Sequence, residues 1–306
     1  MNSSCRRGAS VSGVLVTGAA GFLGSAVCRA ALAGGAPVLG LVRPGELVAP
    51  IEGVEYCELD WAGTAAIAGV LAEAAPGRIV HCAGATPRAQ MSMSDLYDAN
   101  VRLVWQLLDA VKAVVPHAGV VVPSTAAVYG PAPATPAAED EPLNPVTHYA
   151  WSKVLAEETV RAFATADGVR ACVARPFNVL GDGEPAGSVV SDVVSQLRED
   201  PDTPVVRLRE IVSVRDYIYV GDAVDALLVL AERGAPGEVY NVCTGTGVSI
   251  AELVRTILDV WGSRAAIEPT MPDATGTVSI GSATKLRALG WGPRASLRTS
   301  VERASR

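Results

Sequence analysis

Residues Thr17-Gly18-Ala19-Ala20-Gly21-Phe22-Leu23-Gly24 come directly after a short apolar run and open a segment with helical spacing. Their pattern, G-x-x-G-x-x-G, is one residue wider than the usual dinucleotide fingerprint. Gly18 allows a sharp turn, Gly21 lets a pyrophosphate approach the backbone, and Gly24 lets a helix pack closely on a strand. The N-terminus of that helix adds unpaired N–H groups and the positive end of its dipole. The stretch therefore predicts a strand, a phosphate-binding turn and a helix.

Short apolar runs alternate with helical patterns through the first half of the chain. Runs of four to six residues that are rich in Val and bounded by Gly or Pro are typical of buried strands. Strict alternation of strand and helix predicts right-handed crossovers and a parallel, doubly wound sheet. The expected strands are Val14–Val16, Val38–Val42, Val54–Leu59, Arg78–Cys82, Val120–Val122 and Val169–Ala174, and the expected helices are Gly24–Ala33, Ala65–Ala74, Val101–Val115 and Ala150–Ala166.

The alternation loosens after Pro176, and the five prolines of Pro131–Pro145 predict a loop. We expect an α/β fold with a Rossmann-like doubly wound parallel sheet over residues 13–176, to which later segments return. A smaller C-terminal lobe over residues 177–306 is partly interleaved with it. The later elements are expected as helices near Val189–Arg198, Asp222–Ala231, Ile250–Val260 and from about Ser296, and as strands near Val205–Leu208 and Val239–Val242.

Composition and charge exclude several classes of protein. The 306 residues hold 25 Lys and Arg against 32 Asp and Glu, and a formal charge of −7 offers no basic field for nucleic acid or an anionic membrane. The six cysteines are scattered singly, without a C-x-x-C pair or a His at metal-ligand spacing, so we expect reduced thiols and no metal site. The apolar run at Val14 is too short for a signal peptide or a membrane span, so we expect a cytoplasmic protein.

The end of the second expected strand, Val38–Val42, bears on the choice of cofactor. In an NAD site an acidic residue there binds the ribose hydroxyls, whereas the 2′-phosphate of NADP requires a cation. Arg43 follows the strand, and the first carboxylate is Glu46. We therefore favour NADP (NADPH), with Arg43 at the 2′-phosphate, and keep NAD as the alternative; Arg43 stacked on the adenine is a second interpretation. Asp60 could accept from the adenine amino group or cap the next helix.

Tyr149-Ala150-Trp151-Ser152-Lys153 places a phenol and an ammonium four residues apart on one face of an expected helix. A free tyrosine has a pKa of about 10, but a nearby positive charge favours the phenolate and lowers this pKa. Lys153 and an oxidised nicotinamide would both have this effect. Tyr149 is therefore a candidate proton donor and acceptor beside a site of hydride transfer.

Ser124 and Thr125 directly follow the expected strand Val120–Val122. Residues at the carboxyl ends of parallel strands face the ligand crevice of an open α/β sheet. We therefore expect one of these hydroxyls to hydrogen-bond the substrate oxygen that gains or loses a proton. The alternative is that they cap a helix.

Five motifs follow in order: T-G-A-A-G-F-L-G, S-T-A-A-V-Y-G, Y-A-W-S-K, R-P-F-N-V-L-G and V-R-D-Y-I-Y-V. In this combination the chain, from about Gly13 to Arg298, resembles the extended short-chain dehydrogenase/reductase family, in its NAD(P)-dependent sugar-nucleotide epimerase, dehydratase and reductase branch. The resemblance implies Thr125 as the triad hydroxyl, Tyr149 as the acid/base and Lys153 as the residue that orients the nicotinamide ribose.

The resemblance also implies a nucleotide-sugar substrate, bound by the smaller lobe. Arg215 resembles the arginine that contacts the diphosphate of the substrate, a task that suits its bidentate fork. With Arg43 and Asp60 from above, the expected cofactor-binding residues are Gly18, Ala20, Gly21, Phe22, Leu23, Gly24, Arg43, Asp60, Trp61, Cys82, Ala83, Gly84, Asn100, Pro123, Tyr149, Lys153 and Pro176. The expected substrate-binding residues are Ala85, Ser124, Thr125, Asn178 and Arg215.

One departure from the family pattern narrows the activity. The 4,6-dehydratases of this family carry Asp-Glu after the catalytic threonine, whereas this chain has Ala126-Ala127, which can neither donate nor accept a proton. Because Arg43 favours NADPH, we expect reduction of a keto group, on a 4-keto-6-deoxy sugar nucleotide, with Tyr149 as proton donor. The alternatives are an NAD-dependent nucleotide-sugar epimerase with transient oxidation and, from another class, a non-catalytic dinucleotide sensor.

The resemblance further implies a homodimer, formed through the expected helices Val101–Val115 and Ala150–Ala166. Their apolar residues are more numerous than one sheet-facing stripe requires. The alternative is that these residues are buried against the chain's own sheet. They are Val101, Val104, Leu108, Val111 and Val115 on the first helix, and Val154, Leu155 and Val160 on the second.

Overall fold

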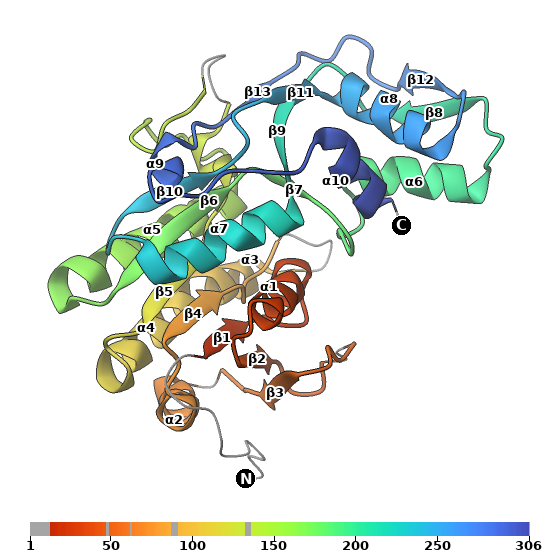
Figure 1. The fold of residues 1–306 in the computed structure, drawn as a ribbon. Coiled ribbons are helices and arrows are strands. Elements are labelled where there is room, and N and C mark those ends of the chain that lie inside the picture. Colours follow the sequence, from red (N-terminus) through yellow and green to blue (C-terminus); the bar gives the residue numbers. More distant parts are fainter. Residues whose placement is uncertain (1–12, 47–48, 62, 87–90, 132–135, 306) are drawn as a thin grey trace. The chain divides into compact units, whose positions relative to one another are not determined.

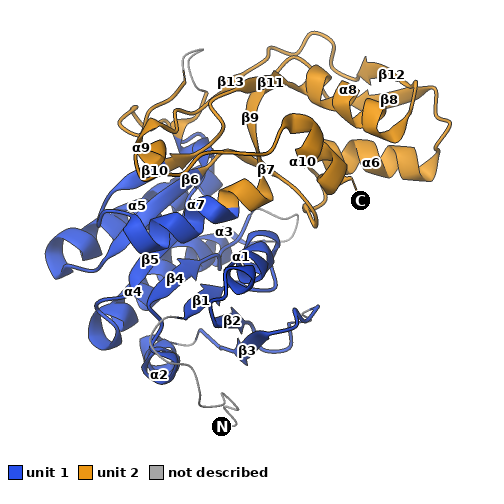
Figure 2. Cartoon of the chain, in the orientation of Figure 1, with its two compact units in different colours: residues 1–128, 145–175, 224–240 blue, residues 129–144, 176–223, 241–306 orange. Residues whose placement is uncertain are grey.

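A computed structural model describes residues 13–46, 49–61, 63–86, 91–131 and 136–305 (Figure 1). The chain divides into two compact units, each built from separate stretches of sequence (Figure 2). Unit 1 comprises residues 1–128, 145–175 and 224–240, and unit 2 comprises residues 129–144, 176–223 and 241–306. Of the loop predicted over Pro131–Pro145, residues 132–135 lie outside the described residues, as does Cys5.

A seven-stranded parallel sheet with the order β10-β6-β5-β4-β1-β2-β3 confirms the predicted fold class. The central strands β1 and β5 are buried along their whole length, which explains their unbroken apolar sequence, whereas the edge strand β3 is partly exposed. The strands are β1 (Val14–Thr17), β2 (Val38–Val42), β3 (Val54–Glu58), β4 (Arg78–His81), β5 (Gly119–Pro123), β6 (Ala171–Pro176) and β10 (Val239–Val242).

Helices flank this sheet (Figure 1). Leu71 of α2 (Thr64–Ala74), Leu107 of α4 (Leu103–Val114) and Val160 of α5 (His148–Asp167) share one core with the strands. Outside this core, α1 (Phe22–Ala33) follows β1, and α7 (Val220–Arg233) comes so close to β5 that a Cβ on Gly119 would lie 1.9 Å from the Ala231 carbonyl oxygen. The helical turns α3 (Met93–Tyr97) and η1 (Asp98–Arg102), which lead into α4, were not predicted.

Unit 2 has a smaller sheet in which β9 pairs with β7 and β13 in parallel and with β11 in antiparallel fashion, and a separate parallel pair, β8 with β12. Its core joins α6, α8 and α10 through Leu197, Ile257 and Val301. Ser249 and Glu252 form a capping box that fixes the start of α8. The elements are β7 (Asn178–Leu180), α6 (Val189–Glu199), β8 (Val205–Leu208), β9 (Val214–Tyr219), β11 (Gly247–Ser249), α8 (Ile250–Trp261), β12 (Ala266–Pro269), β13 (Val278–Ser279), α9 (Thr284–Arg287) and α10 (Leu297–Ala304).

Three further observations concern the described residues only. None of their helices combines the length and the apolar character that crossing a membrane requires. They contain no group of three or more His, Cys, Asp or Glu side chains placed to hold a metal ion. Their cysteines, all of them free thiols, are Cys28, Cys57, Cys82, Cys172 and Cys243.

Candidate active site

The glycine-rich turn lies against the carboxyl end of β4. Gly18 has φ +63°, and a Cβ there would come within 2.8 Å of the backbone of Cys82 and Ala83. A Cβ on Gly24 would lie 2.1 Å from the Gly18 carbonyl oxygen. No described side chain caps α1 at Gly21, and its first turn holds no acidic residue. The free N–H groups at this helix start therefore fit the pyrophosphate of a dinucleotide.

A buried histidine joins the ends of β1 and β4. The Thr17 hydroxyl accepts from the Ala83 N–H at 3.0 Å and lies 2.9 Å from Nδ1 of His81, while Nε2 of His81 has no partner among the described residues. Burial, together with the nearby Lys153 charge, lowers the pKa of His81 to about 3, so this ring is neutral. Trp61 stands edge-on to it, with the ring centres 5.9 Å apart.

Asn100, which is fully buried in η1, connects the loop after β4 to α5. Its side chain bonds both backbone groups of Ala85, at 2.8 and 2.9 Å, and donates to the Ser152 hydroxyl at 3.0 Å. A Cβ on Gly84 would lie 3.0 Å from the Asn100 Oδ1 atom and 3.6 Å from the Lys153 ammonium. Asn100 therefore links the loop after β4 to α5 beside Lys153, and its expected role in cofactor binding stays a prediction.

Thr125, Tyr149 and Lys153, which we call the catalytic set, are brought together inside unit 1. Tyr149 and Thr125 share a side-chain hydrogen bond, and Nζ of Lys153 donates to the Pro123 carbonyl at 3.1 Å. Burial lowers the pKa of Lys153 to about 8, although Cys82 and Glu157 act in the opposite direction. These contacts place a phenol, a hydroxyl and an ammonium at the junction of β5 and α5.

The pKa of Tyr149 differs from the expectation. We expected Lys153 to lower it, whereas burial raises this pKa above its ordinary value, and the only opposing contribution comes from the hydrogen bond with Thr125. The expectation for Lys153 was wrong in this structure because burial of the phenol is the larger effect, whereas the expected effect of an oxidised nicotinamide stays a prediction. The phenol therefore keeps its proton at neutral pH.

Ser124 and Thr125 have different surroundings. Ser124 is buried, and its hydroxyl donates to the Glu157 carboxylate at 2.5 Å, so the structure gives it a partner other than the predicted substrate. Thr125 is partly exposed and, besides bonding Tyr149, accepts from the Ala127 N–H at 3.2 Å at the start of the 3₁₀ turn η2 (Ala126–Tyr129). Thr125 therefore caps the turn η2, as the alternative interpretation proposed, and it also contacts Tyr149.

Arg43 lies at the end of β2, and its side chain is 75% exposed. It forms an ion pair with Glu46 at 2.9 Å, and Glu46 also accepts from the Arg43 N–H. Burial tends to raise the pKa of Glu46, but these contacts with Arg43 outweigh it and lower the pKa. Asp60 is exposed, and α2 begins after Gly63 without a side-chain cap, so the capping interpretation of Asp60 was wrong.

Three predicted residues belong to unit 2. Pro176 ends β6, and Asn178 in β7 donates to the Asp216 carbonyl at 3.3 Å. The Arg215 guanidinium contacts Thr277, donating to its carbonyl and to its hydroxyl at 2.7 Å each. Their predicted contacts with cofactor and substrate stay predictions.

Two charged residues at the site, Glu157 and Arg175, were not predicted from the sequence. Both are buried, and they form a bidentate pair at 3.0 and 2.6 Å. A signal was present: Glu157 lies four residues after Lys153, on the same helix face, and Arg175 interrupts an apolar strand.

Comparisons with known proteins agree with this geometry. The model of the NAD dependent epimerase/dehydratase family matches residues 14–243. The chain is 32% identical to dTDP-6-deoxy-L-talose 4-dehydrogenase (NAD(P)(+)) of Kitasatospora kifunensis, over 94% of this chain and 93% of that protein. It is 30% identical to UDP-glucose 4-epimerase of Azospirillum brasilense, over 92% and 87% of the two chains. The structure of RMD from Pseudomonas aeruginosa complexed with NADPH has a TM-score of 0.80 at 27% identity, over 95% and 97%.

These matches confirm the family that the five motifs indicated. Both relatives are named as enzymes of nucleotide-sugar chemistry, and the first is named with NAD(P)(+), which removes the alternative of a non-catalytic sensor. The chain is therefore an enzyme and belongs to the NAD dependent epimerase/dehydratase family.

Proposed function

We propose that this enzyme reduces the keto group of a 4-keto-6-deoxy sugar nucleotide, with NADPH as cofactor and Tyr149 as proton donor. The observation that carries the proposal is the catalytic set, in which a protonated phenol is hydrogen-bonded to Thr125 close to the Lys153 ammonium. NADPH, when bound, supplies the hydride. Tyr149 carries its proton at neutral pH, which is the state from which a reductase needs it to act, whereas the first step of an epimerase requires a base.

The residues of the catalytic set have separate tasks in this reaction. Thr125 orients the Tyr149 phenol and can hydrogen-bond the substrate oxygen. Tyr149 gives its proton to that oxygen as the carbonyl carbon accepts the hydride, so the ketone becomes a secondary alcohol. Lys153 orients the nicotinamide ribose, the role that the family resemblance implies, and water returns the proton to Tyr149.

The similarity to dTDP-6-deoxy-L-talose 4-dehydrogenase supports C4 as the reacting carbon and a 6-deoxy sugar nucleotide as the substrate. Its name describes dehydrogenation at C4 of a 6-deoxy sugar nucleotide, and reduction of a 4-keto group is the same reaction in the opposite direction. The 30% identity to a UDP-glucose 4-epimerase favours epimerisation as the second candidate. A reductase consumes NADPH in a 1:1 ratio with its substrate, whereas an epimerase interconverts two sugars with no net change in the absorbance of the reduced nicotinamide.

Tyr149→Phe tests the role of the phenol. We expect kcat to fall by about 10²–10⁴-fold, since general acid catalysis contributes that much, while dinucleotide affinity stays within about twofold. Tyr97→Phe, which removes a phenol hydroxyl bonded to His148 outside the catalytic set, is the control and should keep wild-type kcat. Full turnover by Tyr149→Phe would exclude Tyr149 as the proton donor.

For the quaternary structure we propose a homodimer through α4 and α5. Large apolar side chains on these helices are exposed: Trp105 by 49%, Trp151 by 50% and Leu155 by 43%. Such a surface suits a second copy of the chain. Of the eight apolar residues expected there, four are buried in unit 1 instead: Val104, Leu108, Val111 and Val160.

Sedimentation velocity tests the dimer. We expect the wild type to sediment at twice its monomer mass of 31.5 kDa and Trp151→Glu to sediment as a monomer, because the substitution would bury a charge in the interface. A wild type that stays monomeric at high concentration would contradict the proposal.

A further inference from the structure

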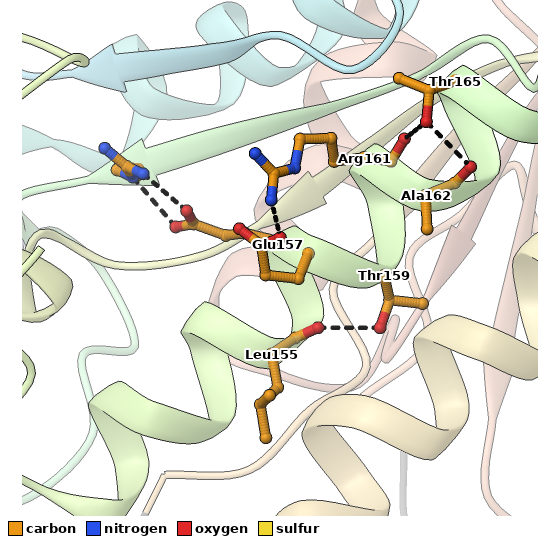
Figure 3. Close-up of polar contacts among 8 residues, drawn as sticks. Leu155, Glu157, Thr159, Arg161, Ala162 and Thr165 are labelled. Atoms are coloured by element: carbon orange, nitrogen blue, oxygen red, sulfur yellow. Dashed lines mark hydrogen bonds and ion pairs between the residues drawn. The ribbon is translucent and has the colours of Figure 1, made fainter.

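A buried ion pair lies one helical turn beyond Lys153. The Glu157 carboxylate accepts from Nε and Nη2 of Arg175 at 3.0 and 2.6 Å (Figure 3). Their side chains are only 6% and 4% exposed. Taking two charges out of water carries a large desolvation cost, and apolar residues in such positions often give a protein of equal or higher stability. Stability alone is therefore a weak reason for this pair.

The carboxylate has a third contact, to the end of β5. The Ser124 hydroxyl donates to Oε1 of Glu157 at 2.5 Å. Ser124 lies between two residues that contact the same face of α5, so three consecutive residues bond three consecutive turns of one helix. The three contacts are Thr125 with Tyr149, Pro123 with Lys153, and Ser124 with Glu157.

We propose that Glu157, held by Arg175, is a positioning residue: through Ser124 it fixes the end of β5 against the face of α5 that carries the catalytic set. Its carboxylate is occupied by Ser124 and Arg175, and it acts on the catalytic set through them. The inference rests on the proposed catalytic roles and not on the choice of sugar. A displacement of about 1 Å in a catalytic group can lower the rate by on the order of 10²-fold, so this connection affects turnover.

The charge of Glu157 also acts on Lys153. The groups around Lys153 are His81 and Cys82 at the end of β4, the Pro123 carbonyl of β5, Asn100 beside Gly84, Arg175 of β6 beyond Glu157, and Tyr149 and Glu157 on its own helix. Burial lowers the pKa of Lys153 to about 8, and the Glu157 carboxylate opposes that decrease. Removing the carboxylate charge should therefore lower the pKa of Lys153 further.

Ser124→Ala separates positioning from folding, because it removes the connection and leaves the ion pair intact. We expect kcat to fall by about 10–100-fold, with a small change in KM and in the thermal midpoint. Glu157→Gln should reduce kcat at least as much and shift the alkaline limb of the pH profile to lower pH. Glu158→Gln, one residue further along and paired with Arg161 on the exposed side, is the matched control, and kcat and the pH profile should not change.

A second measurement needs no substrate. The chain has three lysines, at positions 112, 153 and 285, so the ¹³Cε signal of Lys153 can be followed by NMR titration and assigned with Lys153→Met. We expect a lower Lys153 pKa in Glu157→Gln and an unchanged one in Glu158→Gln. If no keto sugar is reduced by the wild type, the proposed function fails, while this titration still tests the effect of Glu157.

The proposal is overturned if Ser124→Ala turns over at the wild-type rate. It is also overturned if Glu157→Gln loses stability but keeps the wild-type pH profile and Lys153 titration. If Glu157→Gln does not fold, Ser124→Ala decides the question alone.

Discussion

Gly24→Ala should disrupt the phosphate-binding turn. The new Cβ would lie 2.1 Å from the Gly18 carbonyl oxygen, and its other close neighbours, at 2.8 and 3.1 Å, are backbone atoms that cannot rotate away. Ordinary contact begins at 3.4 Å, so helix and turn must separate by roughly 1.3 Å. Overpacking of this kind costs about 1–3 kcal/mol, and the better helix propensity of Ala offsets up to about 1 kcal/mol. We expect a net loss of about 1–2 kcal/mol in the free energy of unfolding.

Dinucleotide affinity should change more than stability. Because the displaced turn carries the N–H groups at the start of α1, we expect the Kd for NADPH to rise by on the order of 10–100-fold. Urea denaturation and fluorescence titration measure the two effects. Gly69→Ala in α2 is the matched control: its Cβ meets nothing within 4 Å, so it should stabilise by about 0.5–1 kcal/mol and leave the Kd unchanged. If Gly24→Ala kept the wild-type Kd and stability, the placement of this turn would be refuted.

Three further predictions concern charges at the site. Arg43→Ala should lower the ratio of kcat/KM for NADPH to kcat/KM for NADH by about 10–100-fold, which is the contribution of a charge-assisted hydrogen bond. Glu46→Gln, which removes the competing carboxylate, should raise this ratio. An unaltered ratio in both variants would exclude Arg43 as the phosphate ligand. Reductase activity should fall above about pH 8, as Lys153 loses its proton, and a rate that stays flat to about pH 10 would argue against a charged Lys153. The pKa of His81 is about 3 in the folded state and about 6.5 in the unfolded state, so between these values the unfolded state binds more protons. The free energy of unfolding should therefore fall on acidification through this window, by up to about 1.4 kcal/mol per pH unit. Urea denaturation across pH should show a smaller decrease in His81→Gln.

The regular elements of unit 1 were predictable because the spacing of apolar residues and the Gly and Pro residues that bound them specify each element locally. The runs that became β1, β2 and β5 are continuous and apolar, since both faces of a central parallel strand are buried. The short strands of unit 2 left no such pattern. β7, β11 and β13 have only two or three residues each, and their pairing with β9 depends on contacts between distant parts of the sequence.

The site residues were predictable where a motif ties chemistry to spacing, as it does for Tyr149 and Lys153. Glu157 and Arg175 were missed because a charge in the sequence does not reveal its partner, and they are 18 residues apart. The upward shift of the Tyr149 pKa was missed for a related reason. The sign depends on how deeply the phenol is buried and on where the Lys153 ammonium points, and neither follows from spacing.

Hydride transfer from cofactor to sugar is the central claim, and an isotope measurement tests it most directly. The wild type is incubated with a 4-keto-6-deoxy sugar nucleotide and with NADPH that carries deuterium at the position of the transferred hydride. The mass of the product is then measured by mass spectrometry. We expect one deuterium per product molecule, on the former keto carbon, with one NADPH oxidised for each. A sugar nucleotide that is interconverted without gaining deuterium and without net oxidation of NADPH would contradict it.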